Sequence, residues 1–86
     1  MPQTPPHIRE LQRLDQAIRT YPDVAMNYVL RGEYWIKRRQ PHKAIEDFEK
    51  ALRLAEVELE ASDWEYREQA VIDRAEQGIR LAERFL

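Results

Sequence analysis

The sequence predicts an all-α protein of four helices in a single domain. Apolar residues recur at spacings of three and four along nearly the whole chain, and the alternation typical of half-buried strands is absent. Only two of the 86 residues are glycine, and hydrophobic and charged residues make up 43% and 35% of the chain. That balance suits amphipathic helices in water. We expect one helical domain over residues 5–86, preceded by a flexible tail at residues 1–4.

The first helix is predicted to begin near Pro5 or Pro6, with Thr4 as its cap. Proline suits a first helical turn because its missing N–H has no partner there in any case. The helix should end before Pro22, which pushes Tyr21 away from helical geometry. Its apolar positions are Ile8, Leu11, Leu14, Ala17 and Ile18.

The second helix follows Asp23, a residue type that caps helix N-termini well. The cationic run at residues 37–39 suits a helix C-terminus, and Gln40-Pro41 then indicates a tight turn. The apolar positions of this helix are Met26, Val29, Leu30, Tyr34, Trp35 and Ile36.

The third helix follows the turn at Pro41, and the fourth follows a predicted capping box formed by Ser62 and Glu65. Gly78 inside the fourth helix costs about 1 kcal/mol relative to alanine, and it marks a kink, a break or a close helix contact. The third helix carries Ala44, Ile45, Phe48, Ala51, Leu52, Leu54, Ala55 and Leu59. The fourth carries Trp64, Val71, Ile72, Ala75, Ile79, Ala82 and Phe85.

The chain also repeats itself with a period of 34 residues, so that residues 14–19 match residues 48–53. Residues 25–58 form the complete unit, a helix–turn–helix with large residues at Tyr28, Trp35 and Phe48. Small residues at Gly32, Ala44 and Ala51 allow the two helices to approach closely, and the large residues fill the space between the helices. This unit resembles the tetratricopeptide repeat (TPR) family, whose period is 34 residues. The resemblance implies antiparallel helical hairpins stacked as a short right-handed array.

The resemblance extends to both sides of that unit. Upstream, Leu14, Ala17 and Ile18 resemble the second helix of a preceding repeat. Downstream, a shift of 36 residues aligns the second predicted helix with the fourth, which resembles the first helix of a third repeat or a terminal capping helix. Two positions depart from the family pattern. Arg31 stands where the family usually has leucine, and Glu56 stands where it has a closing proline, so the third helix is expected to run on to about Ala61.

Residues suited to catalysis are few, and we expect neither an enzyme nor a cofactor or metal site. The chain has no cysteine, its only histidines are His7 and His42, and its only serine, Ser62, is already explained as a cap. The two histidines are not at metal-ligand spacing, and no glycine-rich phosphate loop is present.

Charge is unevenly distributed along the sequence. Residues 1–43 carry a net charge of +4 and residues 44–86 a net charge of −6. Such poles steer a charged partner or bring two copies together head to tail, unless they simply belong to a solvated surface. The basic cluster contains Lys37, Arg38, Arg39, His42 and Lys43. It suits phosphate contacts, but the chain is acidic as a whole, so we do not expect nucleic-acid binding. Without a signal peptide or an apolar run of about 20 residues, we expect a cytoplasmic protein that does not insert into membranes.

The resemblance to TPR proteins implies binding of another protein in a groove lined by the first helices of the repeats. The groove residues would be Met26, Val29, Glu33, Ile36 and Lys37 from the second predicted helix, and Glu65, Gln69, Ile72 and Asp73 from the fourth. We expect an adaptor, scaffold or assembly factor that binds a helix or extended segment of its partner. Alternatively, Met26 and Ile36 simply pack on the fourth helix. The protein is then a self-associating homo-oligomeric module or a small permanent subunit of a larger complex.

Overall fold

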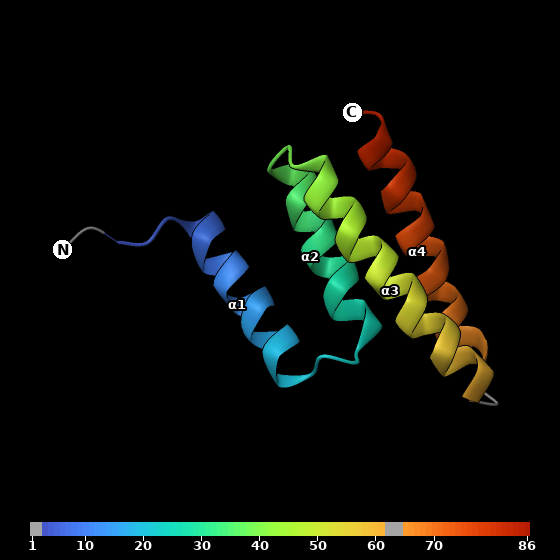
Figure 1. The fold of residues 1–86 in the computed structure, drawn as a ribbon. Helices are drawn as coiled ribbons and strands as arrows, with labels where there is room; N and C mark the ends of the chain where they lie inside the picture. The colour runs from blue at the N-terminus through green and yellow to red at the C-terminus, as the bar shows by residue number, and fades with distance from the viewer. Residues whose placement is uncertain (1–2, 62–64) are drawn as a thin grey trace.

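A computed structural model describes residues 3–61 and 65–86, and these residues form four helices and no strand. The helices are α1 (Pro6–Thr20), α2 (Ala25–Lys37), α3 (Pro41–Ala61) and α4 (Glu65–Glu83). Consecutive helices run in opposite directions (Figure 1). The predicted all-α class with four helices is confirmed, as is the extension of α3 to Ala61. The Ser62–Glu65 capping box, residue Trp64 and the first two residues of the predicted tail lie outside the described residues.

The predicted side-chain caps of α1 and α2 are wrong. Pro5 is the N-cap of α1, and its carbonyl accepts hydrogen bonds from the N–H groups of Ile8 and Arg9, so Thr4 stands one residue too early. Val24 is the N-cap of α2, and Asp23 likewise precedes it by one residue. The Tyr28 hydroxyl instead secures the start of α2 by donating a 2.9 Å hydrogen bond to the Pro22 carbonyl oxygen.

The turn from α2 to α3 depends on an arginine in the left-handed region. Arg39 has a φ of 58°, which glycine adopts freely and other residues at a cost. The N–H of Gln40 donates to the Trp35 carbonyl at 2.9 Å, and the N–H of Arg39 donates to the Ile36 carbonyl at 3.0 Å. These two bonds satisfy carbonyl groups at the end of α2 in a Schellman motif. The side chain of Arg39 lies over the ring of Phe85 at 4.9 Å, which joins this turn to the end of α4.

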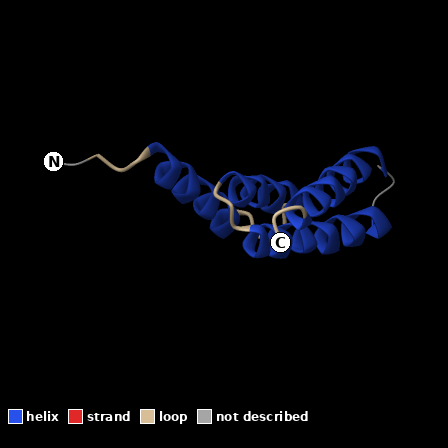
Figure 2. Cartoon of the chain, turned by 90° about the horizontal axis from the view of Figure 1, so that it is seen from above, coloured by secondary structure: helices blue, strands red, loops and turns tan. Residues whose placement is uncertain are grey.

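The core lies between α2, α3 and α4, while α1 packs on α2 alone and has no buried residue. Figures 1 and 2 show α1 at one side, with its N-terminal end directed away from the other helices. At the centre, Phe48 of α3 is fully buried between the two glycines of the chain, Gly32 of α2 and Gly78 of α4. Of the three possibilities for Gly78, the structure shows the close helix contact, since α4 runs unbroken through it.

We expect Gly78→Ala to destabilise the fold although alanine is the better helix former. A Cβ at position 78 would overlap the Phe48 ring, and two ring carbons would lie 2.6 Å from it. Overpacking costs about 1–3 kcal/mol, and so close an overlap with a buried ring belongs to the upper part of that range, about 2–3 kcal/mol. The helix gain is about 1 kcal/mol, so the net loss is about 1–2 kcal/mol. This corresponds to a fall in melting temperature of roughly 5–15 °C, measurable by circular dichroism. Gln77→Ala, at an exposed position of the same helix, is the control. An unchanged or raised melting temperature for Gly78→Ala would contradict this packing.

Candidate functional site

The predicted groove residues of α2 have different surroundings in the structure. Val29 is 0% exposed and belongs to the core, so it is not available to a partner, and this part of the predicted site is wrong. Periodicity alone did not show this because Val29 belongs to a core that also contains residues of α3 and α4, and only tertiary packing creates that core. Met26 and Ile36 are partly buried against the same core, and Lys37 is exposed, with its Nζ 4.0 Å from Glu10 of α1.

On α4, Ile72 is partly buried against the core, and the side chain of Glu65 lies outside the described residues. Gln69 is exposed and donates a 2.9 Å hydrogen bond to Asp73 one turn later. The two polar residues predicted on this side of the groove therefore contact each other along the outer surface of α4.

An ion pair joins α2 and α4 in the middle of the predicted groove. Arg74 donates two hydrogen bonds of 2.7 Å to the two carboxylate oxygens of Glu33. The hydrogen bond to Glu33 raises the pKa of Arg74 above its ordinary value, against the smaller opposing effect of partial burial. Local sequence does not reveal this pair, since its members are 41 residues apart. The groove is thus bridged at Glu33, and its apolar residues on either side are already partly or, for Val29, fully buried.

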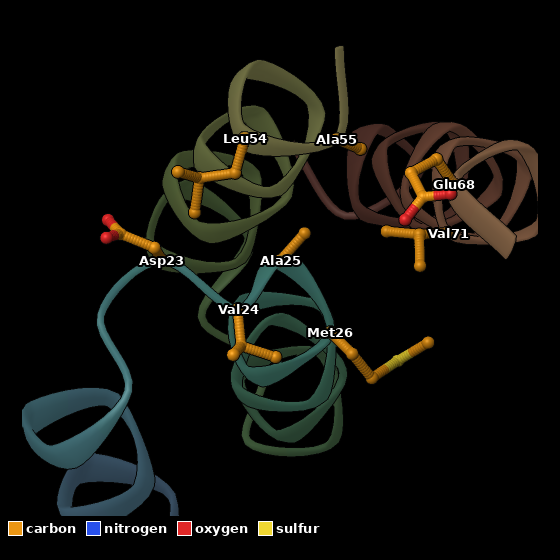
Figure 3. Close-up of a pocket in the computed structure, with 8 residues that line it drawn as sticks. All are labelled: Asp23, Val24, Ala25, Met26, Leu54, Ala55, Glu68 and Val71. Carbon is orange, nitrogen blue, oxygen red and sulfur yellow. The ribbon is translucent and has the colours of Figure 1, made fainter. Parts of the chain in front are cut away.

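An open pocket of about 470 Å³ remains at one end of the groove, where the N-terminal part of α2 meets α3 and α4. Among the predicted site residues whose side chains are described, Met26 is the one that lines it. Figure 3 shows α2 residues Ala25 and Met26 facing Leu54 and Ala55 of α3 and Val71 of α4 across the pocket. Apart from two acids, all the described residues that line it are apolar. These described residues are Asp23, Val24, Ala25, Met26, Leu54, Ala55, Glu68 and Val71.

The two acids, Asp23 and Glu68, lie on opposite sides of the pocket (Figure 3). Asp23 is exposed, whereas Glu68 is only 6% exposed. Among the described residues that line the pocket, none is lysine or arginine. The pocket therefore combines an apolar interior with negative charge, which suits an apolar group that has a cation beside it. Sequence reasoning missed most of these residues because they come from three helices and share no local motif.

A second hollow, of about 410 Å³, lies between α1 and α3 over the outer side of α2. Its apolar surface comes from Leu11 and Trp35, and Lys43 places its Nζ 4.6 Å from the Trp35 ring centroid. Trp35 is consequently only partly buried, although the repeat pattern places it among the space-filling residues. The rest of the hollow consists of charged side chains, several of which pair with each other.

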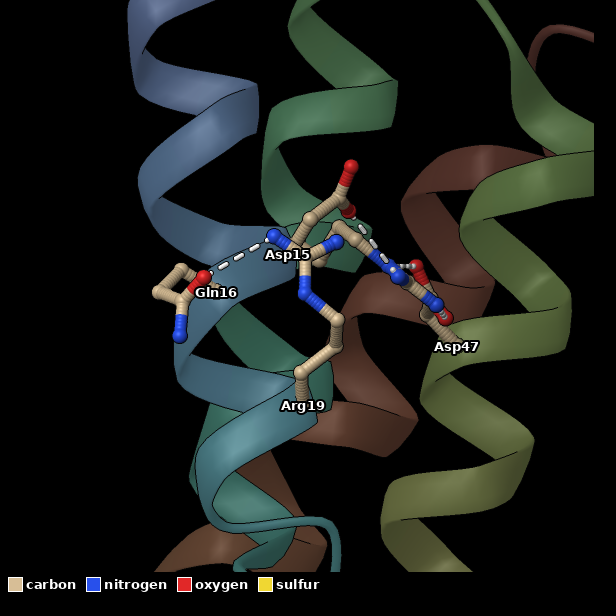
Figure 4. Close-up of polar contacts among 5 residues, drawn as sticks. Asp15, Gln16, Arg19 and Asp47 are labelled. Carbon is tan, nitrogen blue, oxygen red and sulfur yellow. Dashed lines mark hydrogen bonds and ion pairs between the residues drawn. The ribbon is translucent and has the colours of Figure 1, made fainter.

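Arg31 is the centre of those charges. It donates two hydrogen bonds of 2.8 Å to Asp47 of α3 and one of 3.1 Å to Asp15 of α1 (Figure 4). The hydrogen bond to Asp47 is the main reason that the pKa of Arg31 is raised, and it outweighs the opposing effect of burial. Because the raised pKa keeps the guanidinium charged, deprotonation of Arg31 does not break the pair at any pH below the ordinary pKa of arginine. This network accounts for an arginine where the repeat pattern has leucine, and it joins three helices.

The fold and the pocket together define a small helical protein with an apolar pocket flanked by acids. Comparisons with protein-family models, with curated proteins and with solved structures found no match to this chain. Within the described residues, no cluster of histidines and carboxylates has the arrangement of a metal site. None of the described helices combines the length and the apolar character needed to cross a membrane.

Proposed function

We propose that this chain is a non-catalytic protein–protein interaction module of the TPR type. Its pocket binds one or two large apolar side chains from a segment of another protein, and the exposed Asp23 attracts a lysine or arginine next to them. The observation that carries this proposal is the pocket of about 470 Å³ with its apolar lining and two acids. Engineered apolar cavities of about 150 Å³ hold a benzene ring, so this volume is sufficient for a phenylalanine or leucine side chain.

Two further features support the proposal. The period of 34 residues and the helix–turn–helix unit at residues 25–58 resemble a family that binds peptides. In addition, the pocket lies at the α2–α4 surface, where the first helices of TPR arrays present their binding groove. Apolar anchors supply most of the affinity in such sites, while charges at the rim orient the ligand and raise the association rate. We also propose that binding takes place in the cytoplasm, which agrees with a chain that has no cysteine.

Selection from a random 12-residue peptide library tests the proposal without a known partner. We expect the enriched peptides to contain a large apolar residue beside lysine or arginine, and to bind with dissociation constants of about 1–100 μM. Val24→Lys, at an exposed pocket residue, removes apolar lining and offsets the acids, so it should weaken binding at least tenfold in a fluorescence anisotropy titration.

Leu30→Lys is the matched control, because Leu30 is an exposed residue of α2 that does not line the pocket. This variant should bind the selected peptides as the unmodified protein does. Peptides that bind Val24→Lys and the unmodified protein equally well would place the binding surface elsewhere. A selection that enriches no peptide at all would count against the interaction module itself.

A further inference from the structure

The end of α4 carries apolar and cationic side chains of the kind that the pocket suits. The α4 tip, which we define as Arg84, Phe85 and Leu86, presents two large apolar side chains, and Leu86 is 65% exposed. Arg84 is exposed beside them, and the guanidinium of Arg39 lies over the Phe85 ring. Arg80 is also exposed one turn earlier, and Glu83 has the one acidic side chain among residues 80–86. The charged side chains around the two apolar residues of the α4 tip are therefore mainly positive.

We propose that the pocket at the α2–α3–α4 junction binds the α4 tip of a second copy of this chain. This inference rests on the proposed function, because it names the segment that the pocket binds. The two surfaces complement each other in both respects that matter. Phe85 and Leu86 supply the apolar side chains that the pocket can hold, and Arg84 supplies the cation for Asp23.

The geometry makes the contact intermolecular. The pocket is at the start of α4, at Glu68 and Val71, and the tip follows the end of the same helix. A straight helix rises 1.5 Å per residue, so Glu68 and the tip are about 27 Å apart in one copy. Figure 1 shows the C-terminal end beside the α2–α3 turn, at the opposite end of the helices from the start of α2. No copy can therefore fill its own pocket.

Electrostatics also favours one arrangement of two copies over the others. A contact between two tips brings arginines together, and a contact between two pockets brings acids together. Both symmetric arrangements place like charges in contact, which disfavours them. A contact between a tip and a pocket is heterologous, so a dimer still has one free tip on one copy and one free pocket on the other. The expected product is an open series of dimers, trimers and longer head-to-tail assemblies whose length grows with concentration.

Sedimentation velocity with two complementary variants tests this inference. The unmodified chain should associate increasingly between about 10 μM and about 1 mM, the range of weak contacts. Raising the salt concentration from about 0.05 to about 0.5 M should weaken the association several-fold, since rim charges are screened. Leu86→Glu, which removes the tip, and Val24→Lys, which alters the pocket, should each remain monomeric. Leu30→Glu, an exposed site in neither surface, should associate normally.

The mixture of the two variants is decisive. Leu86→Glu retains an intact pocket and Val24→Lys retains an intact tip, so an equimolar mixture should form dimers and nothing larger. An unmodified chain that stays monomeric over this range, or a mixture that stays monomeric, would overturn the inference. If the monomeric chain nevertheless binds selected peptides in a way that Val24→Lys abolishes, the proposed function stands and only the second copy as ligand is excluded.

Discussion

Replacing Phe48 by alanine should lower the free energy of unfolding by about 3–5 kcal/mol, the usual loss for a large buried aromatic residue. The ring is 0% exposed and fills the space where α2, α3 and α4 approach each other. Its neighbours across the helix contacts are glycines, which have no side chains with which to fill the cavity. A domain of this size is stable by roughly 4–13 kcal/mol, so the loss takes much of its stability. Urea denaturation followed by circular dichroism measures it.

The other phenylalanine of the chain is the matched control. Phe85 is 39% exposed at the end of α4, and Phe85→Ala should cost less than about 1 kcal/mol. A double-mutant cycle adds a sharper test of the contact with Gly78. With alanine at position 48 there is no ring to meet, so Gly78→Ala should then stabilise the protein by up to about 1 kcal/mol through helix propensity. Equal losses for both phenylalanines, or a Gly78→Ala effect that does not change sign, would contradict the structure.

Replacing Arg31 by alanine should cost about 2–3 kcal/mol. Asp47 is only 5% exposed, and without Arg31 its carboxylate stays buried without the two short hydrogen bonds that now neutralise it. Breaking a buried pair by removing one partner costs about 3–5 kcal/mol, and we reduce this because the Arg31 side chain is itself 25% exposed. Loss of the bond to Asp15 also weakens the attachment of α1. Thermal and urea unfolding both report the change.

Arg74→Ala is the control, since Arg74 makes an equally short bidentate pair with Glu33 but in a more exposed place. It should cost no more than about 1 kcal/mol. The double substitution Arg31→Leu with Asp47→Ala removes the buried charge and restores the leucine of the repeat pattern, so it should recover much of the lost stability. Equal costs for the two arginines would show that burial of Asp47 does not govern the energy of this pair.

Much of the fold was predictable from residue spacing, and the errors were local. The period of three and four places apolar residues on one face of each helix, and the prolines at 22 and 41 limit α1, α2 and α3. The predicted N-caps of α1 and α2 were one residue too early, because Pro5 and Val24 occupy the N-cap positions. Neither residue type is a preferred N-cap, so cap propensities alone do not predict these positions. Arg39 in the left-handed region was not anticipated, since glycine is the usual residue there.

The candidate site was much less predictable. Of the nine residues first assigned to a binding groove, Met26 is the one with a described side chain that lines the pocket, Val29 is in the core, and Glu33 is paired with Arg74. A helix presents only about half of its surface to its neighbours, and spacing does not say which neighbour covers which part. Leu54, Glu68 and Val71 had no reason to be grouped with Val24 until three helices were assembled.

By itself, the sequence determined the number and the approximate limits of the helices, the pairing of small and large residues across α2 and α3, and the opposite charges of the two halves of the chain. These properties depend on residues close in sequence or on composition. The tertiary structure alone decided that Gly78 faces Phe48, that Arg31 joins three helices, and that the groove is bridged by Glu33 and Arg74. Those contacts span 16 residues or more, and their geometry depends on how the helices pack rather than on any local pattern.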